Sequence, residues 1–301
     1  MEPEPSPLPL KFRLGTSSWS AKGWVGPFYP PGTKPGAFLA WYATQFDTVE
    51  ADTTYYRLPT TRLVDGWDRA LPEGFELSAK FPRTIVHAGE GARPDAETVL
   101  VWDKVGRDAE LFVERMSRLG SKLGALVLQF PYFNKQAFES AGPFLERLDH
   151  FLESLPRGPK LAVEIRNKAW IQEPLLECLR RHGVALCLVD LLYMPHPDTL
   201  SQRFDLFTAD FTYVRLIGDR KAVDQKTKTF DRIVLDQDQR LDRWAAFLKE
   251  AGSVPEAYVY ANNHFAGHGP STIRELAQRL DVHLEGPGGP PTPRRDLFSD
   301  S

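Results

Sequence analysis

The stretch LAVEIRNKAWIQEPLLECLRRHGVALCLVDL at residues 161–191 decides the fold. Two short apolar runs, at 161–165 and 184–189, enclose a segment at 173–181 whose apolar residues recur at three- and four-residue spacing. A near-continuous apolar strand is typical of a parallel sheet that helices cover on its face, whereas the three-to-four spacing is typical of an amphipathic helix. The stretch therefore predicts a strand–helix–strand unit, in which the helix carries the chain back to a second, parallel strand.

The same pattern repeats along most of the chain. Strands are predicted at 12–17, 46–51, 75–80, 125–130, 161–165, 184–189, 212–217 and 257–261. Helices are predicted at 35–44, 63–70, 108–119, 137–155, 173–181, 198–204, 241–250 and 271–280. Eight such units close naturally into a (β/α)8 TIM-type barrel. An open doubly wound α/β sheet is the alternative, but no G-x-G-x-x-G or phosphate-loop motif supports it.

The two ends of the chain differ from this interior. Residues 1–10 alternate proline with glutamate or leucine, and residues 285–301 are rich in glycine and proline. Neither composition favours a helix or a central strand. We therefore expect one barrel domain at 11–284 between flexible tails at 1–10 and 285–301.

The composition excludes several classes of protein. Hydrophobic residues make up 42% of the chain, which is enough for a large buried core. The 37 basic and 40 acidic residues give a formal charge of −3, which argues against a generally basic nucleic-acid binder but permits a local basic patch. Two cysteines, the absence of a long apolar run and an acidic start favour a cytoplasmic protein without disulfides, membrane contact or signal peptide.

Charged and polar side chains gather where the predicted strands end. In a (β/α)8 barrel this end carries the catalytic residues, and buried charges there are costly unless paired. Cations at the barrel mouth suit phosphate or carboxylate recognition, and a carboxylate suits proton transfer. The candidate catalytic residues are Glu50, Lys80, His87 and Glu164. The candidate substrate- or anion-binding residues are Ser17, Trp19, Tyr55, Gln129, Arg166, Asp190, Arg215, Asn262 and Asn263.

Two loops strengthen the expectation of an anion site. The loop after the seventh predicted strand carries four cations: Arg220, Lys221, Lys226 and Lys228. The loop after the eighth contains glycines and leads into a predicted helix at Ser271, whose first backbone N–H groups would face an anion. These two loops are the usual place for a phosphate in this architecture.

Other interpretations of the same residues stay open. The charges at the strand ends would also satisfy one another, with Glu50, Glu164 and Asp190 neutralising Lys80, Arg166 and Arg215. His264 and His268 have a spacing that aligns metal ligands on a helix, but the neighbouring glycines predict a loop, so no metal site is assigned. The sequence identifies no cofactor.

Several short segments resemble one known family. They are GTSSW at 15–19, FYPPG at 28–32, VEADTTYY at 49–56, AKFPRTIVH at 79–87, LQFPYF at 128–133, VEIRNKAW at 163–170, YVRLIG at 213–218 and YANN at 260–263. In this order they resemble the DUF72 family, also called the YecE-like or UPF0759 family. The resemblance implies a TIM barrel but no established reaction, substrate or cofactor. It also places most of the candidate residues among the family's polar residues at the barrel mouth. The chain differs from the family pattern at Asp52, where asparagine is usual, and at Ile217, where histidine is common.

Three functional hypotheses follow. The first is a hydrolase or lyase that acts on a phosphate-bearing or otherwise anionic substrate at the barrel mouth. The second is a protein that binds single-stranded or flipped nucleotides between the aromatic and basic side chains of the mouth. The third is a ligand-binding barrel without chemistry. The segment RRDLF at 294–298 is similar to peptides that dock onto the bacterial sliding clamp, which makes Asp296, Leu297 and Phe298 candidate contacts with that partner.

Overall fold

Eight parallel strands form one sheet in the computed structural model, which describes residues 10–88, 94–251 and 254–287. Their order in the sheet is β1-β8-β7-β6-β5-β4-β3-β2. The strands are β1 (Lys11–Thr16), β2 (Thr48–Ala51), β3 (Glu76–Lys80), β4 (Leu123–Gln129), β5 (Leu161–Glu164), β6 (Ala185–Leu191), β7 (Phe211–Gly218) and β8 (Glu256–Ala261). Each predicted strand is present within about two residues of its expected bounds, and the predicted fold class, an α/β TIM-type barrel, is confirmed.

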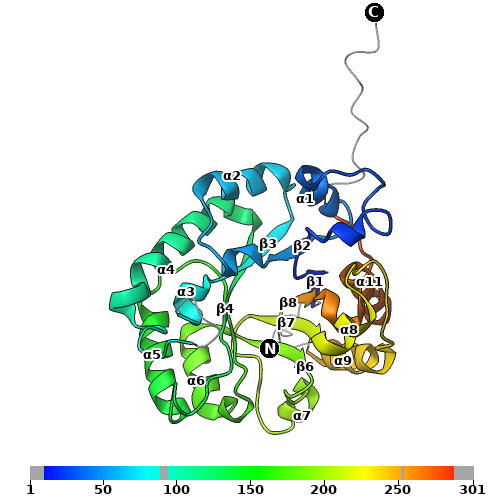
Figure 1. Ribbon diagram of the computed structural model, residues 1–301. Coiled ribbons are helices and arrows are strands. Elements are labelled where there is room, and N and C mark those ends of the chain that lie inside the picture. The colour runs from blue at the N-terminus through cyan, green and yellow to red at the C-terminus, as the bar shows by residue number, and fades with distance from the viewer. Residues whose placement is uncertain (1–9, 89–93, 252–253, 288–301) are drawn as a thin grey trace, which may run out of the picture.

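The sheet curls until its two edge strands, β1 and β2, lie side by side (Figure 1). Gly15 on β1 makes this close approach possible, because a Cβ atom there would lie 2.1 Å from the backbone oxygen of Thr48 on β2. Glycine is thus required at this contact by the neighbouring backbone rather than by its own φ angle. The barrel is nearly closed at this point.

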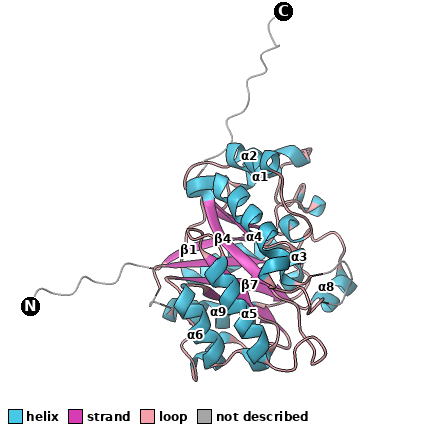
Figure 2. Ribbon diagram, turned by 90° about the vertical axis from the view of Figure 1, so that its left-hand side faces the viewer, coloured by secondary structure: helices cyan, strands magenta, loops and turns pink. Residues whose placement is uncertain are grey.

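Helices surround the strands on the outside of the barrel (Figures 1 and 2). The longer ones are α2 (Thr61–Ala70), α4 (Trp102–Met116), α5 (Ala141–Ser154), α6 (Glu173–His182), α9 (Asp238–Glu250) and α11 (Gly269–Leu280). The shorter ones are α1 (Phe38–Tyr42), α3 (Arg83–Val86), α7 (Pro197–Ser201), α8 (Arg220–Lys226) and α10 (Asn263–Ala266). None of these described helices is both long enough and apolar enough to cross a membrane.

Helix α6 shows how the local sequence sets an element. Pro174 occupies its first turn, where a missing N–H costs nothing, and Gly183 ends it with a φ of 63°. Leu175, Leu176 and Leu179 are buried on the face that packs toward the sheet. Burying each such side chain contributes about 1.5–3 kcal/mol, which is the main stabilisation of a helix this short.

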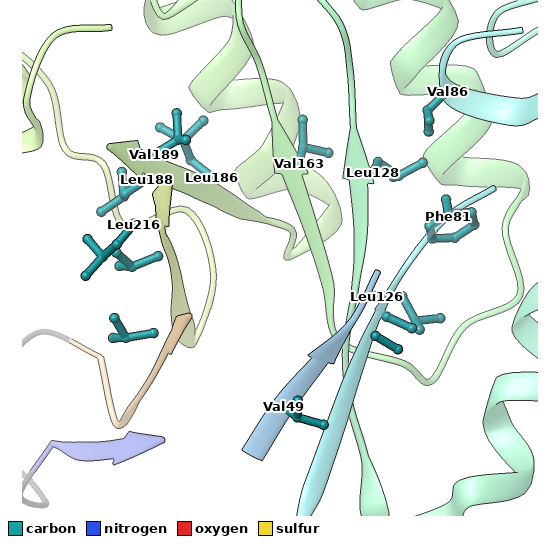
Figure 3. Close-up of a cluster of buried hydrophobic side chains, with 14 of the residues drawn as sticks. Val49, Phe81, Val86, Leu126, Leu128, Val163, Leu186, Leu188, Val189 and Leu216 are labelled. Carbon is teal, nitrogen blue, oxygen red and sulfur yellow. The ribbon is translucent and has the colours of Figure 1, made fainter. Parts of the chain in front are cut away.

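The alternation of side chains along each strand divides the core into two layers. Outward residues such as Leu126, Leu128, Val163, Leu186 and Leu188 join the large cluster between strands and helices (Figure 3). Inward residues fill the barrel itself, and they are Ala125, Val127, Ala162, Ala185, Cys187, Phe211, Tyr213, Tyr258 and Tyr260. Further along the strands, the inward positions become charged, and these charges form the floor of the barrel mouth.

Two segments predicted as loops contain short helices, and most of both predicted tails lies outside the described residues. Helices α8 and α10 occupy positions 220–226 and 263–266, where we expected loops, since one or two turns leave too short a periodic pattern to recognise. Residues 1–9 and 288–301, which hold most of the two predicted tails, lie outside the described residues, as does the candidate clamp-binding motif with Asp296, Leu297 and Phe298.

Candidate active site at the barrel mouth

A buried charge cluster centred on Arg215 closes the interior of the barrel below its mouth. Arg215 on β7 donates from Nη2 to Oε1 of Glu50 at 3.0 Å and from Nη1 to Oε1 of Gln129 at 2.6 Å. Its Nη1 also donates to Oε2 of Glu164. The hydroxyl of Tyr213 donates to Oε2 of Glu50 at 2.8 Å. Four predicted site residues, from β2, β4, β5 and β7, therefore meet in one network.

The two glutamates of this cluster are held ionised. Burial alone raises the pKa of Glu50, but Arg215 and Lys80 outweigh it, and the net pKa lies below the ordinary value. Burial likewise opposes ionisation of Glu164, whereas Arg215 and Arg166 bring its pKa down to about 2. Neither glutamate has measurable exposure, and neither lines the cavity above. Both were predicted as acid–base residues, but this environment suits a fixed negative charge that orients the arginines.

A cavity of about 570 Å³ opens above the cluster at the carboxyl ends of the strands. Among the described residues, five cations line it: Lys80, Arg166, Arg215, Arg220 and Lys221. Two carboxylates line it, those of Asp52 and Asp219. The lining therefore has more cations than carboxylates, although Glu50 and Glu164 beneath it pair with Lys80, Arg166 and Arg215, and Asp224 lies 3.5 Å from Arg220. A protein that concentrates one sign of charge in a cleft attracts ligands of the opposite sign.

Arg166 lines this cavity, and the terminal nitrogens of its guanidinium group are open to a ligand. Its Nε donates to Oε1 of Glu164 at 2.9 Å, and 27% of its side chain is exposed. Its terminal nitrogens have no hydrogen-bond partner among the described residues. A guanidinium anchored on one side and open on the other is suited to bidentate recognition of a phosphate or carboxylate.

Asp52 is the titratable group of this cavity that the sequence analysis did not select. Burial raises its pKa, Lys80 lowers it in part, and Glu50 adds to the rise. The pKa of Lys80 moves the opposite way, since burial and the nearby Arg215 lower it, although Glu50 lies 3.5 Å away. Perturbed pKa values of neighbouring groups in one cleft are typical of functional sites.

Helix α8 brings two further cations to the rim. Gly218 ends β7 with a φ of 77°, and a Cβ atom there would lie 2.4 Å from the Cα of Phe265, so this turn requires glycine. Asp219 then caps α8 by accepting from the backbone N–H of Ala222 at 3.0 Å. The cap places Arg220 and Lys221 at the cavity, on the same side of the barrel as α3 (Figure 2).

Asp190 is not where the sequence analysis placed it. Along β6 it follows Leu186 and Leu188 on the outward face, and its carboxylate accepts from Nε1 of Trp244 at 2.6 Å and from Arg240. Both partners lie on α9. Its carboxylate thus fastens α9 to the sheet, and it is absent from the described residues that line the mouth cavity.

Two other predicted residues also lie apart from the cavity lining. Trp19 packs edge-on against Trp67, with ring centroids 5.8 Å apart. His87 is buried at the end of α3, and its Nδ1 lies 3.2 Å from the carbonyl of Ala88. Neither is among the described residues that line the cavity, whereas Tyr55 is, as expected.

The first turn of α11 does not offer free donors to an anion. The Oδ1 of Asn263 accepts from the backbone N–H of Gly269 at 2.9 Å, and Nδ1 of His268 accepts from that of Ser271 at 3.3 Å. The expected phosphate site at this helix N-terminus is therefore corrected, because the helix caps itself. Asn263 lines instead a second, smaller cavity, together with Ser17 and Asn262.

One group of side chains with metal-ligating atoms lies on the outer helices α5 and α6. Asp149, Cys178 and His182 have their ligand atoms within 4.8 Å of one another. However, Asp149 already accepts from His182 at 2.7 Å and lies 3.1 Å from Arg181. Burial, and next the Asp149 carboxylate, raise the pKa of the Cys178 thiol to about 11. An arginine neighbour and a protonated thiol favour an ion-pair cluster over a cation site.

Comparison with known proteins agrees with this architecture. Residues 13–297 match the family described as "Protein of unknown function DUF72". The chain belongs to the DUF72 family. It is 30% identical over 184 residues to the UPF0759 protein YecE of Escherichia coli K12, a match that spans 59% of this chain and 58% of YecE. It is also 25% identical to YunF of Bacillus subtilis over 91% of this chain and 96% of YunF.

The fold is shared with a solved member of the family. A DUF72 family protein from Thermotoga maritima superposes with a TM-score of 0.68 at 26% identity, covering 90% of this chain and 99% of that one. Membership of the DUF72 family thus accounts for the barrel fold, whereas only the residues at the barrel mouth bear on the reaction.

Proposed function

We propose that this DUF72 protein is an enzyme, a hydrolase or lyase, that binds a phosphate-bearing or otherwise anionic substrate in the mouth cavity. The observation that carries the proposal is the coincidence of five lining cations with one carboxyl of raised pKa, Asp52, in the same cavity. Both reaction types need an anchor for the anion and a group that moves a proton, which are the two components present here.

The residues of the barrel mouth have three separate roles: anion binding, proton transfer and the positioning of the arginines. Arg166, Arg220 and Lys221 bind the anion at the open side of the cavity. Asp52 accepts or delivers the proton. The nearby Lys80, whose pKa is lowered, carries the positive charge that stabilises the Asp52 carboxylate. Glu50 and Glu164 hold Arg215 and Arg166 in place rather than touching the substrate, which revises their predicted role to that of positioning residues.

Two sets of variants test the proposal. The double variant Arg220→Met/Lys221→Met should weaken binding of inorganic phosphate about tenfold or more, measured by calorimetry at low salt. Lys226→Met/Lys228→Met, from the same basic segment but outside the cavity lining, is the matched control and should bind as the wild type does. Equal loss in both pairs would mean that general charge, and not this cavity, attracts the anion.

The chemical step is tested separately. A panel of phosphate esters is assayed for release of phosphate or formation of a double bond. With any substrate found, Asp52→Asn should abolish turnover and keep the affinity for phosphate. An Asp52→Asn variant that retains full turnover would refute the assignment of the proton-transfer group.

A second function is favoured by the rim of the same cavity. Tyr56 and Tyr193 line it with 71% and 50% of their surface exposed, beside Arg220 and Lys221. Exposed aromatic rings between cations are suited to stacking on unpaired bases. Binding of a short single-stranded oligonucleotide should then fall steeply with salt and be lost in Tyr56→Ser/Tyr193→Ser. Absence of binding at low salt removes this alternative.

A further inference from the structure

A second cavity of about 270 Å³ adjoins the first at the barrel mouth. It lies at the ends of β1 and β8, and its lining includes Ser17, Trp24 and Phe230. Asp52, Asn262 and His264 line both cavities. A ligand that reaches from one cavity into the other would therefore pass the Asp52 carboxyl.

The charge of the second cavity differs from that of the first. No lysine or arginine is among the described residues that line it. Burial lowers the pKa of His264, so this ring is neutral at neutral pH. Apart from the Asp52 carboxyl, the other polar lining groups are hydroxyls and amides, from Ser17, Ser18, Ser20, Asn262 and Asn263 among others. This second cavity is thus built for neutral, hydrogen-bonding groups.

Two of its lining side chains carry buried polar atoms that lack a partner. Ser17 and Trp24 are 2% and 1% exposed, and neither Oγ of Ser17 nor Nε1 of Trp24 is hydrogen-bonded within the described part of the chain. An indole N–H is only a donor, and such buried donors are nearly always paired in native proteins. These two buried groups are therefore the polar atoms of this cavity's walls that an acceptor oxygen of a ligand would satisfy.

A third unpaired atom lies against the same wall. The ring of His268 packs edge-on against Trp24, with centroids 5.9 Å apart. Its Nδ1 accepts from the backbone N–H of Ser271 at 3.3 Å and lies 2.7 Å from the Ser271 hydroxyl, and burial lowers its pKa to about 4. Nε2 of His268 is likewise buried without a partner. The unpaired polar atoms thus belong to one corner of the mouth rather than to scattered positions.

We infer that the substrate is a phosphate ester of a hydroxylated carbon chain, whose hydroxyl or carbonyl oxygens bind Ser17 and Trp24 in the second cavity. This inference rests on the proposed function, since the phosphate occupies the first cavity. The shared position of Asp52 then places its carboxyl beside the carbon chain, between the phosphate and the neutral end. The second cavity favours a ligand that carries hydroxyl groups, and the first cavity favours the negatively charged phosphate.

Calorimetry with three probes tests the inference: inorganic phosphate, propyl phosphate and glycerol 3-phosphate. The last two have the same chain length and differ in hydroxyl groups. The wild type should bind glycerol 3-phosphate about tenfold more tightly than propyl phosphate, the difference that one to two hydrogen bonds supply. Ser17→Ala and Trp24→Phe should each reduce this preference toward unity, with the affinity for inorganic phosphate unchanged.

The outcomes separate this inference from the proposed function. If inorganic phosphate does not bind the wild type, the proposed function fails, and the inference fails with it. If phosphate binds but the two esters bind equally, only the second-cavity inference is overturned. A crystal structure with glycerol 3-phosphate in the first cavity and water alone on Ser17 and Trp24 would also overturn it. Trp24→Phe is interpreted only if its melting temperature matches that of Ser17→Ala, because Trp24 is a fully buried core residue.

Discussion

The Nζ atom of Lys80 lies 3.5 Å from Oε1 of Glu50, while the same side chain lines the cavity that contains Asp52. One ammonium group therefore connects a carboxylate that is fixed in its ionised form with a carboxyl whose pKa is raised. The floor of the barrel and the acid–base group of the mouth are electrostatically coupled through this side chain.

Replacing Lys80 should move the titration of Asp52. Lys80 lowers the pKa of Asp52 against the opposing effects of burial and Glu50, so Lys80→Met should raise that pKa further. NMR titration of carbon-labelled aspartate side chains measures the shift directly. Lys122→Met, which removes a lysine paired with Asp68 on the outer surface, serves as the control. An unchanged Asp52 titration in Lys80→Met would show that the two groups are not coupled.

Removing Arg215 should destabilise the whole barrel. Arg215→Met leaves the buried Glu50 and Glu164 without their common partner, which costs about 3–5 kcal/mol of unfolding free energy. The comparison is Arg243→Met, which breaks an ion pair with Asp198 on the surface and should cost about 0–1 kcal/mol. Urea denaturation of both variants measures the difference. Similar midpoints would contradict a structural role for the cluster.

Acid should destabilise the protein in two ranges of pH. Burial lowers the pKa of His268 to about 4 from an ordinary 6.5, so the unfolded chain binds a proton that the folded chain does not as pH falls through this interval. Its contribution to stability is complete above 6.5 and is lost on the way to 4. For Glu164 the corresponding interval runs from 4.5 down to about 2.

The first range can be isolated with a variant. Asparagine at 268 keeps a capping acceptor for α11 but does not titrate, so His268→Asn should flatten the fall in unfolding free energy between pH 6.5 and 4. The measurement is the difference between wild-type and variant stability at each pH, which cancels the groups that both share. A difference that stays constant across this range would rule out His268 as the source.

Asp190 should matter for stability and not for ligand binding. Asp190→Ala removes the acceptor of the buried Trp244 indole and the partner of Arg240, at a cost of about 1–3 kcal/mol. Affinity for inorganic phosphate should equal that of the wild type, because Asp190 faces α9. A drop in phosphate affinity without a loss of stability would return Asp190 to the site.

The barrel was predictable because most strand positions are apolar and the apolar residues of its longer helices recur every three to four residues. The residues of β5, α6 and β6 carry both signals, with one acid at the end of β5, Glu164, and one near the end of β6, Asp190. Helices α3, α8 and α10 were not predicted, since a helix of four to seven residues spans only one or two turns and leaves too short a period to detect.

The site was predictable in composition but less so in geometry. Strand ends predicted Glu50, Gln129, Glu164 and Arg215 as site residues, and the structure brings these four side chains together in one network. Asp190 was misplaced, although two-residue alternation with Leu186 and Leu188 already assigns it to the outward face. Asp52 was passed over, although it stands two residues after Glu50 and so continues the inward side of β2.

The cluster around Arg215 also governs how the chain can be assembled or divided. Glu50 comes from β2, Glu164 from β5 and Arg215 from β7, so the two acids are synthesised well before the guanidinium that stabilises their ionised forms inside the barrel. An emerging chain that ends before β7 holds both carboxyls without their common arginine, and neither half of the barrel has the complete network. Native charge inside this barrel is thus a property of the finished chain, reached only when its seventh strand is in place.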